Sequence, residues 1–213
     1  MNKISVILVD DHAVVRAGFR MLLASVNTIE IIAEAESGEA ACQLYLNKQP
    51  DVVVLDLSMP GIGGLECIRR ICSRNPQAKI LVFSVHDESV YVSRAIAAGA
   101  LGYITKNSAP EILVDAIQKI AAGGIYIEAG LEKTSRTHQN EVDYKSLINT
   151  LTPKEFDVFC LLAKGLTTHK IANELCMGYK TAANHGTQIK NKFNAATVAE
   201  LAHIATALGI IKR

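Results

Sequence analysis

The chain has 213 residues, of which 49% are apolar and 20% carry a charge. This length predicts two domains, and the apolar fraction is enough to bury a core in each. No apolar run approaches the roughly 20 residues of a membrane span, and no cleavage site follows the short apolar start, so we expect a soluble cytoplasmic protein without a membrane partner. The five cysteines form no CxxC pair, which argues against a zinc site or a disulfide framework and favours a packing role.

The charge is divided unevenly along the chain. Residues 1–128 contain 11 Lys and Arg against 14 Asp and Glu, whereas residues 147–213 contain 8 against 4. An acidic first part and a basic last part indicate different partners, and nucleic acid is the candidate partner of the last part.

Short apolar runs alternate with helical patterns through residue 122. The expected strands are 4–9, 29–34, 52–55, 79–84 and 102–105. The expected helices are near 13–25, 38–47, 64–74, 90–98 and 110–122, the last opened by a capping box of Ser108 and Glu111. Strict β–α alternation predicts an α/β domain over residues 1–125, with a doubly wound five-stranded parallel sheet and helices on both faces.

The pattern changes after this domain. Residues 126–146 are polar and aperiodic, so we predict a linker there. Residues 147–213 show only helical patterns, which predicts a second, smaller all-α domain. Its first helix has Thr152 as N-cap and Glu155 three residues later, and its second and third helices, joined by a turn with Gly178, form a helix-turn-helix pattern.

Reactive side chains stand at the ends of the predicted strands. Asp10 and Asp11 follow the first strand, Asp56 follows the third, Ser84 ends the fourth and Lys106 follows the fifth. Ligands of a doubly wound sheet bind at the carboxyl ends of its strands, so we expect these side chains to converge. Clustered carboxylates favour Mg²⁺, and Asp56 could attack a phosphoryl donor whose other oxygens Ser84 and Lys106 would hold.

Residues 1–122 resemble the receiver domain of a two-component response regulator, whose fold is flavodoxin-like. The five side chains at the strand ends match its motif positions, and the segment LDLSMPGIGGLE is similar to its phosphoacceptor segment. The resemblance implies that Asp56 accepts a phosphoryl group from a sensor histidine kinase, with Lys106 and Ser84 assisting. It also implies a switch pair, Ser84 and Tyr103. The implied Mg²⁺ ligands are Asp10 through water, Asp11, Asp56 and the carbonyl of Ser58.

The third helix of the last part, from Tyr179 to Phe193, has two contrasting faces. Apolar spacing predicts that Ala182, His185, Ile189 and Phe193 form its buried stripe. Asn and Gln can pair with adenine and lysines can hold phosphates, so the opposite face is typical of a DNA-recognition helix. The candidate DNA-binding residues are Lys180, Ala183, Asn184, Thr187, Gln188, Lys190, Asn191 and Lys192.

Residues from Leu151 to Phe193 resemble the LuxR-type output domain of the NarL/FixJ class, and the SMPGIGGLE segment is similar to the GacA/UvrY-like branch. In that family, base contacts come from the positions of Ala183, Asn184 and Thr187. The resemblance implies double-stranded DNA as a partner and a homodimer in the phosphorylated state. Gly186 departs from a good recognition helix, because an internal Gly costs about 1 kcal/mol relative to Ala.

The leading hypothesis is therefore a phosphorylation-regulated transcription regulator, which is not an enzyme. One alternative is a receiver that acts through protein–protein contacts, with the helical domain docking a partner. A second is an aspartyl-phosphate phosphatase. This alternative is disfavoured because the nucleophile of those enzymes lies in a DxD motif near the chain start, whereas Asp56 is followed by Leu57 and Ser58.

Overall fold

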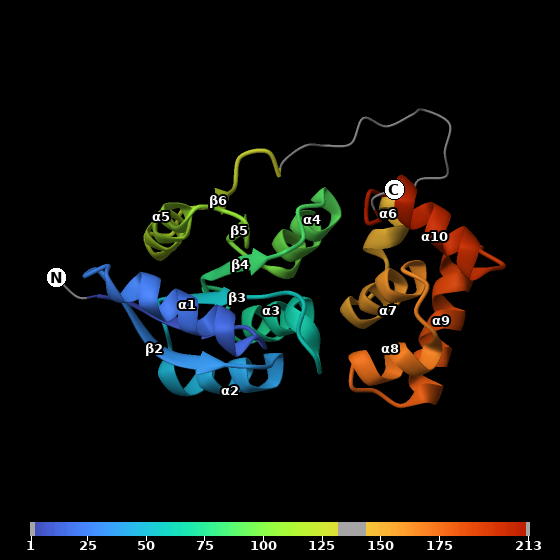
Figure 1. Cartoon of the computed structure of the whole chain (residues 1–213), viewed down its shortest axis with the longest axis horizontal. Coiled ribbons are helices and arrows are strands. Elements are labelled where there is room, and N and C mark those ends of the chain that lie inside the picture. Colours follow the sequence, from blue (N-terminus) through green and yellow to red (C-terminus); the bar gives the residue numbers. More distant parts are fainter. Residues whose placement is uncertain (1–2, 132–143, 212–213) are drawn as a thin grey trace. The chain divides into compact units, whose positions relative to one another are not determined.

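The computed structural model describes residues 3–131 and 144–211 of the chain (Figure 1). These residues fall into two compact units, an α/β unit that contains the sheet and a unit made only of helices. The division confirms the predicted fold class. Most of the segment predicted as a linker, residues 126–146, lies outside the described residues.

The α/β unit is built on a parallel sheet with the strand order β2-β1-β3-β4-β5-β6. Its strands are β1 (Ile4–Val9), β2 (Ile29–Ala35), β3 (Val52–Leu55), β4 (Ile80–Ser84), β5 (Gly102–Thr105) and β6 (Tyr126–Ile127). The helices between them are α1 (Ala13–Ala24), α2 (Gly38–Lys48), α3 (Gly63–Arg74), α4 (Ser89–Ala98) and α5 (Pro110–Ala121). The first five strands are those predicted, whereas β6 lies within the expected linker and pairs with β5.

Burial of the central strands on both faces explains their apolar sequences. All residues of β3 are buried, and so are all residues of β4. Side chains of α1 and α5 join those of β1, β3, β4 and β5 in one core cluster, while α2 and α3 pack against each other. The strand order reverses between β1 and β3, and such a switch point opens a crevice at the carboxyl ends of these two strands.

The helical unit contains the predicted helix-turn-helix. Its helices are α6 (Tyr144–Asn149), α7 (Pro153–Ala163), α8 (Thr168–Glu174), α9 (Tyr179–Phe193) and α10 (Val198–Ala207). The core includes Phe159 stacked on Phe193 with ring centroids 5.1 Å apart, and full burial of one such ring is worth about 1.5–3 kcal/mol. Helix α6 begins within the expected linker. Within the described ranges, no helix is long and apolar enough to cross a membrane.

The two predicted capping boxes have different outcomes. At α7, the Thr152 hydroxyl accepts from the Glu155 N–H at 3.2 Å, and the Glu155 carboxylate accepts from the Thr152 N–H at 2.8 Å, which confirms the prediction. At α5 the prediction was wrong: Pro110 is the first helical residue, so the N-cap is Ala109, which makes no side-chain capping bond. The hydroxyl of Ser108 is paired instead with that of Thr105 at 3.0 Å.

Candidate phosphoacceptor site and nucleic-acid interface

The strand pairing brings Asp10 and Asp56 to the same edge of the sheet. Val9 and Leu55 are partners in the β1–β3 ladder. Asp10 directly follows Val9, and Asp56 directly follows Leu55. The Asp56 N–H also donates to the Val9 carbonyl at 2.9 Å. Both aspartates are only 2% exposed. A buried carboxylate requires a charged or hydrogen-bonding partner, so both must be paired within the site.

Lys106, which follows β5, supplies that partner to both carboxylates. Its ammonium lies 2.6 Å from Asp10 Oδ2 and 2.7 Å from Asp56 Oδ2. Burial by itself would lower the pKa of Lys106, but its hydrogen bonds to Asp10 and Asp56 outweigh burial and raise the pKa above the ordinary value. Lys106 therefore stays an ammonium ion and holds one oxygen of Asp56 in place.

The other oxygen of Asp56 is available to bind a metal ion or to attack a phosphoryl group. Asp56 Oδ1 is buried and accepts no hydrogen bond from the described residues. Asp10, Asp11, His12 and Asp56 each offer one ligand atom, and these atoms all lie within 4.8 Å of one another. Mg²⁺ prefers carboxylate oxygens and retains several waters, so the three carboxylates of this set fit the ion.

His12 belongs to this cluster although the sequence reasoning did not select it. Its Nδ1 lies 2.9 Å from Asp11 Oδ1 and 3.2 Å from Asp10 Oδ1. Its backbone N–H donates to Asp10 Oδ1 at 2.8 Å, at the N-cap position of α1. The only signal in the sequence was its place directly after the aspartate pair.

Ser84 and Tyr103, the predicted switch pair, are joined through His86. Both side chains are fully buried, at 0% exposure. The Ser84 hydroxyl accepts from the His86 N–H at 3.3 Å, and the Tyr103 hydroxyl donates to the His86 carbonyl at 2.9 Å. The His86 ring stacks on Tyr91 and lies 3.0 Å from the Ser58 hydroxyl. His86 therefore links the loops that follow β3 and β4.

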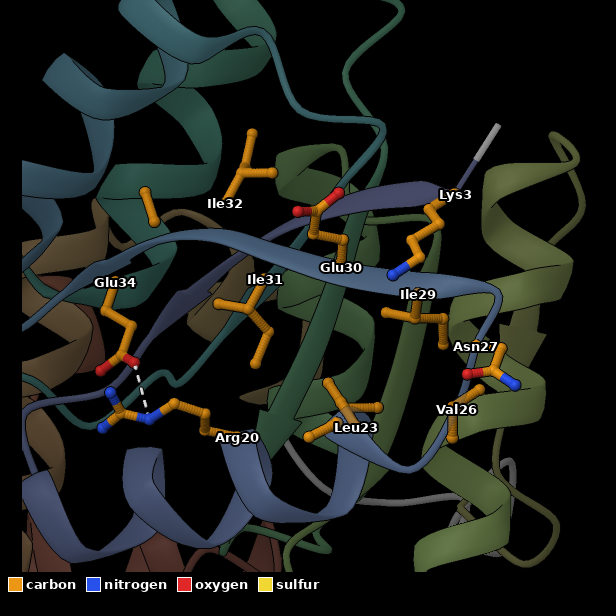
Figure 2. Close-up of a pocket in the computed structure, with 12 residues that line it drawn as sticks. Lys3, Arg20, Leu23, Val26, Asn27, Ile29, Glu30, Ile31, Ile32 and Glu34 are labelled. Carbon is orange, nitrogen blue, oxygen red and sulfur yellow. Dashed lines mark ion pairs between the residues drawn. The ribbon is translucent and has the colours of Figure 1, made fainter. Parts of the chain in front are cut away.

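Arg16 fixes the loop that follows β1. Its guanidinium donates to the Asp10 carbonyl at 2.6 Å and lies 3.3 Å from the Glu34 carboxylate. A hollow of about 540 Å³ lies beside α1 and β2, and two of its lining residues, Arg20 and Glu34, form an ion pair at 3.4 Å. Figure 2 shows this ion pair among the lining side chains. No residue of the acidic cluster lines this hollow, so it is separate from the candidate phosphoacceptor site.

Helix α9 has the two predicted faces. Ala182, Ile189 and Phe193 are buried, while His185 is only partly buried. Among the candidate DNA-binding residues, Ala183, Lys190 and Lys192 are half-buried and the exposed ones are Lys180, Asn184, Thr187, Gln188 and Asn191. The exposed polar face can therefore meet a nucleic acid without disturbing the packing of α9.

Lys192 and Gly186 of α9 lie toward the rest of the helical unit. The Lys192 ammonium lies 2.7 Å from the buried carboxylate of Glu155 and 3.2 Å from the Thr150 carbonyl, so its contacts are internal to the helical unit. Gly186 faces α7, because a Cβ built there would meet Leu162 at 3.5 Å. Neither position therefore belongs to the exposed polar face, although Lys192 was a predicted phosphate contact.

Family models match both units. Residues 6–118 match the response regulator receiver domain, and residues 149–205 match the bacterial regulatory proteins of the luxR family. The chain belongs to the two-component response regulators. Its combination of a receiver with a LuxR-type helix-turn-helix domain is that of the NarL/FixJ class, as predicted, and this family consists of DNA-binding transcription regulators rather than enzymes.

Relatives of this response regulator match it over nearly their whole length. It is 37% identical to the transcriptional activator protein ExaE of Pseudomonas putida, over 97% of this chain and 98% of that protein. It is 34% identical to the response regulator UvrY of Escherichia coli, over 97% of this chain and 95% of that protein.

Solved structures agree with the fold of each part. A LuxR-family two-component response regulator from an Aurantimonas species is 40% identical, covers 61% of this chain and 93% of its own, and has a TM-score of 0.59. A structure of two RcsB dimers bound to two parallel DNAs is 25% identical, covers 97% of this chain and 99% of its own, and has a TM-score of 0.60.

Proposed function

We propose that Asp56 is the phosphoacceptor of this response regulator and that its phosphorylation controls DNA binding by α9. The observation that carries the proposal is the Asp56 carboxylate itself. One oxygen is held by Lys106 at 2.7 Å, while the other is buried and accepts no hydrogen bond from the described residues. Asp56 Oδ1 is thus oriented to attack the phosphorus of a phosphohistidine on a sensor kinase, or of a small acyl phosphate.

The acidic cluster would hold the cation that this transfer needs. Asp11, Asp56 and the Ser58 carbonyl are the proposed Mg²⁺ ligands, with Asp10 acting through water. When bound, the ion supplies positive charge to the phosphoryl oxygens during transfer. Lys106 stays within reach of the acceptor, and its ammonium would hold another phosphoryl oxygen.

Ser84 and His86 offer a route from the phosphoryl group to the rest of the receiver. In the described conformation the Ser84 hydroxyl accepts from the His86 N–H at 3.3 Å. If the Ser84 side chain rotates toward Asp56 to donate to a phosphoryl oxygen there, its oxygen moves away from the His86 N–H, which then loses this acceptor. The Tyr103 hydroxyl is bound to the carbonyl of the same residue, so the ring of Tyr103 would respond as well.

DNA recognition is proposed for the exposed face of α9. Asn184 and Thr187 would read base edges in the major groove, and Lys180 and Lys190 would contact phosphates. One short helix reads few bases, so we propose that phosphorylation produces a homodimer whose two α9 helices bind half-sites about one turn apart. The protein would act in the cytoplasm, where the DNA and the kinase domain of a sensor are accessible.

Phosphopeptide mapping tests the phosphoacceptor. The protein is incubated with acetyl phosphate, with and without Mg²⁺, and the modified residue is located by mass spectrometry. We expect phosphorylation of Asp56 that needs Mg²⁺ and is absent from Asp56→Asn. Equal modification of the wild type and Asp56→Asn would show that another residue is the acceptor.

Two variants of α9 test the DNA interface. Asn184→Ala should relax the preference at one operator position by about 1–3 kcal/mol and leave non-specific binding nearly intact. Lys190→Ala should weaken binding to all sequences alike and lower the salt slope by about one. The alternative function, a helical domain that docks a protein partner, predicts no steep decrease of DNA affinity with salt.

A further inference from the structure

Two buried cysteines face each other across the contact between α2 and α3. The sulfur atoms of Cys42 and Cys67 are 3.8 Å apart. Cys67 is fully buried, whereas Cys42 retains 8% of its surface in solvent. A disulfide requires the two sulfur atoms to approach to about 2.05 Å, so a small movement of the side chains would bring this pair to bonding distance.

The surroundings give the two thiols different chemistry. Either sulfur can donate to the other, and the Cys67 thiol also lies within 3.5 Å of the Gly38 carbonyl, to which it can donate. A hydrogen bond from Cys67, together with the guanidinium groups of Arg70 and Arg74, lowers the pKa of the Cys42 thiol to about 7 against the effect of burial. The same hydrogen bond and burial raise the pKa of Cys67. Cys42 is therefore the nucleophile of the pair, because the thiolate is the reactive form, and Cys67 stays a thiol.

We propose that Cys42 and Cys67 are an oxidation site at which a hydroperoxide produces a reversible disulfide. The Cys42 thiolate attacks the outer peroxide oxygen, the O–O bond breaks, and the released alkoxide or hydroxide takes a proton, which leaves a sulfenic acid on Cys42. The sulfur of Cys67 then attacks that of Cys42, the S–O bond breaks, and the hydroxyl leaves as water with the thiol proton of Cys67. Two electrons pass from the thiols to the peroxide, and a dithiol reductant reverses the change.

The disulfide would form next to the loop that follows Asp56. Cys42 lies one helical turn after Gly38 in α2, and Cys67 lies one turn after Gly63 in α3. The first turn of α2 already holds this loop, because the Glu39 carboxylate accepts from the Ile62 N–H at 3.1 Å.

Little space is left where α2 meets α3. A Cβ built on Gly38 would lie 2.7 Å from the Ile62 side chain and 3.2 Å from the Cβ of Cys67. Drawing the two sulfurs together should therefore displace the loop rather than be absorbed locally. We expect the oxidised protein to be phosphorylated severalfold more slowly than the reduced protein. This effect rests on the proposed function of Asp56, whereas formation of the disulfide is independent of that function.

The test uses the full-length protein with Cys176→Ser, because the exposed Cys176 could link two molecules. The protein is treated with hydrogen peroxide, denatured with N-ethylmaleimide to block free thiols, digested, and mapped by mass spectrometry. We expect a peptide pair linked through Cys42 and Cys67 that has lost two hydrogen atoms and separates on reduction. The linked pair should persist in Cys72→Ser, the matched control, and disappear from both Cys42→Ser and Cys67→Ala.

The outcomes separate the disulfide from its effect. If Cys42 stops at a sulfinic acid while Cys67 stays free, or if peroxide leaves both thiols free under conditions that oxidise Cys176 in the unsubstituted protein, the oxidation site is refuted. In Cys42→Ser, which keeps every other side chain of this contact, Cys67 should resist oxidation.

The effect on phosphorylation is tested separately, by incubating the reduced and the oxidised protein with acetyl phosphate. Equal rates would refute the effect on the loop, whereas failure of the reduced protein to react would refute the proposed function and leave the disulfide standing.

Discussion

The ammonium of Lys192 lies 2.7 Å from the buried carboxylate of Glu155, and this ion pair joins the last turn of α9 to the first turn of α7. The sequence placed Lys192 beside the DNA-binding face, where it resembled a phosphate contact. In the structure its contacts are with Glu155 and the Thr150 carbonyl. Lys192 therefore supports the helix that carries the recognition face, and Lys190 is the better candidate for a phosphate contact.

Lys192→Ala should destabilise the helical domain by about 1–3 kcal/mol, because it leaves the charge of Glu155 buried without its partner. We expect the low end of this range, because the Lys192 side chain is 34% exposed and its ion pair is partly screened by water. Hydrogen exchange of the α7 and α9 amides measures the change in the full-length chain. Lys190→Ala is the matched control and should weaken DNA binding without loss of protection. Equal protection in the two variants would contradict the structural role of Lys192.

The same ion pair should make the helical domain sensitive to acid. Burial opposes the ionisation of Glu155, but Lys192 and the Thr152 N–H outweigh burial and lower the pKa of its carboxyl group. A lowered folded-state pKa means that the stabilisation is complete above the ordinary carboxyl pKa of about 4.3 and is lost as the pH falls through the folded-state value. The difference in α7 opening free energy between the wild type and Glu155→Gln should thus shrink below about pH 4. A difference that stays constant with pH would exclude this linkage.

Gly186→Ala should stabilise α9 by about 1 kcal/mol, because Ala has the higher helix propensity. The added methyl group would meet Leu162 of α7 at 3.5 Å, an ordinary contact distance. Gly165→Ala is the control and should destabilise, because Gly165 has φ +83°. Loss of DNA affinity in a stabilised Gly186→Ala variant would contradict the position of Gly186 against α7 and would indicate that its backbone approaches DNA.

Lys106→Met should make the receiver depend on Mg²⁺ for its stability. The substitution removes the ammonium shared by the buried carboxylates of Asp10 and Asp56, and loss of one partner from a buried ion pair costs about 3–5 kcal/mol. The divalent ion should recover more stability in this variant than in the wild type, since it then supplies the missing positive charge. Calorimetry of the receiver transition in chelator and in Mg²⁺ measures both effects, with Lys119→Met as control. An equal Mg²⁺-induced shift in the three proteins would argue against a shared counter-ion role for Lys106.

Residues at the ends of buried strands could be located from the sequence. The parallel order fixes which strand ends meet, and the structure indeed brings Asp10, Asp56 and Lys106 within hydrogen-bonding distance. Contacts made by loop side chains could not be located in the same way. His86 contacts Ser58 across two loops whose path depends on the folded chain, and His12 contacts its neighbours Asp10 and Asp11 in a loop where no periodic pattern marks it.

Short elements and long-range pairs were also beyond the sequence patterns. β6 has only two residues and α6 has six, which is too short for an apolar period to appear. At α5, Pro110 decided where the helix starts and displaced the expected cap at Ser108. The ion pair of Lys192 joins residues 37 positions apart, and a helical projection of α9 alone shows only that Lys192 lies at the border of the polar face.

Control of DNA binding by Asp56 is tested most directly by one affinity measurement. The wild type and Asp56→Asn are titrated onto a DNA fragment identified by footprinting, each with and without beryllofluoride and Mg²⁺. We predict that beryllofluoride raises the affinity of the wild type for the fragment and leaves that of Asp56→Asn unchanged. An equal gain in affinity in both proteins, or an unchanged affinity of the wild type, would contradict the control of DNA binding by Asp56.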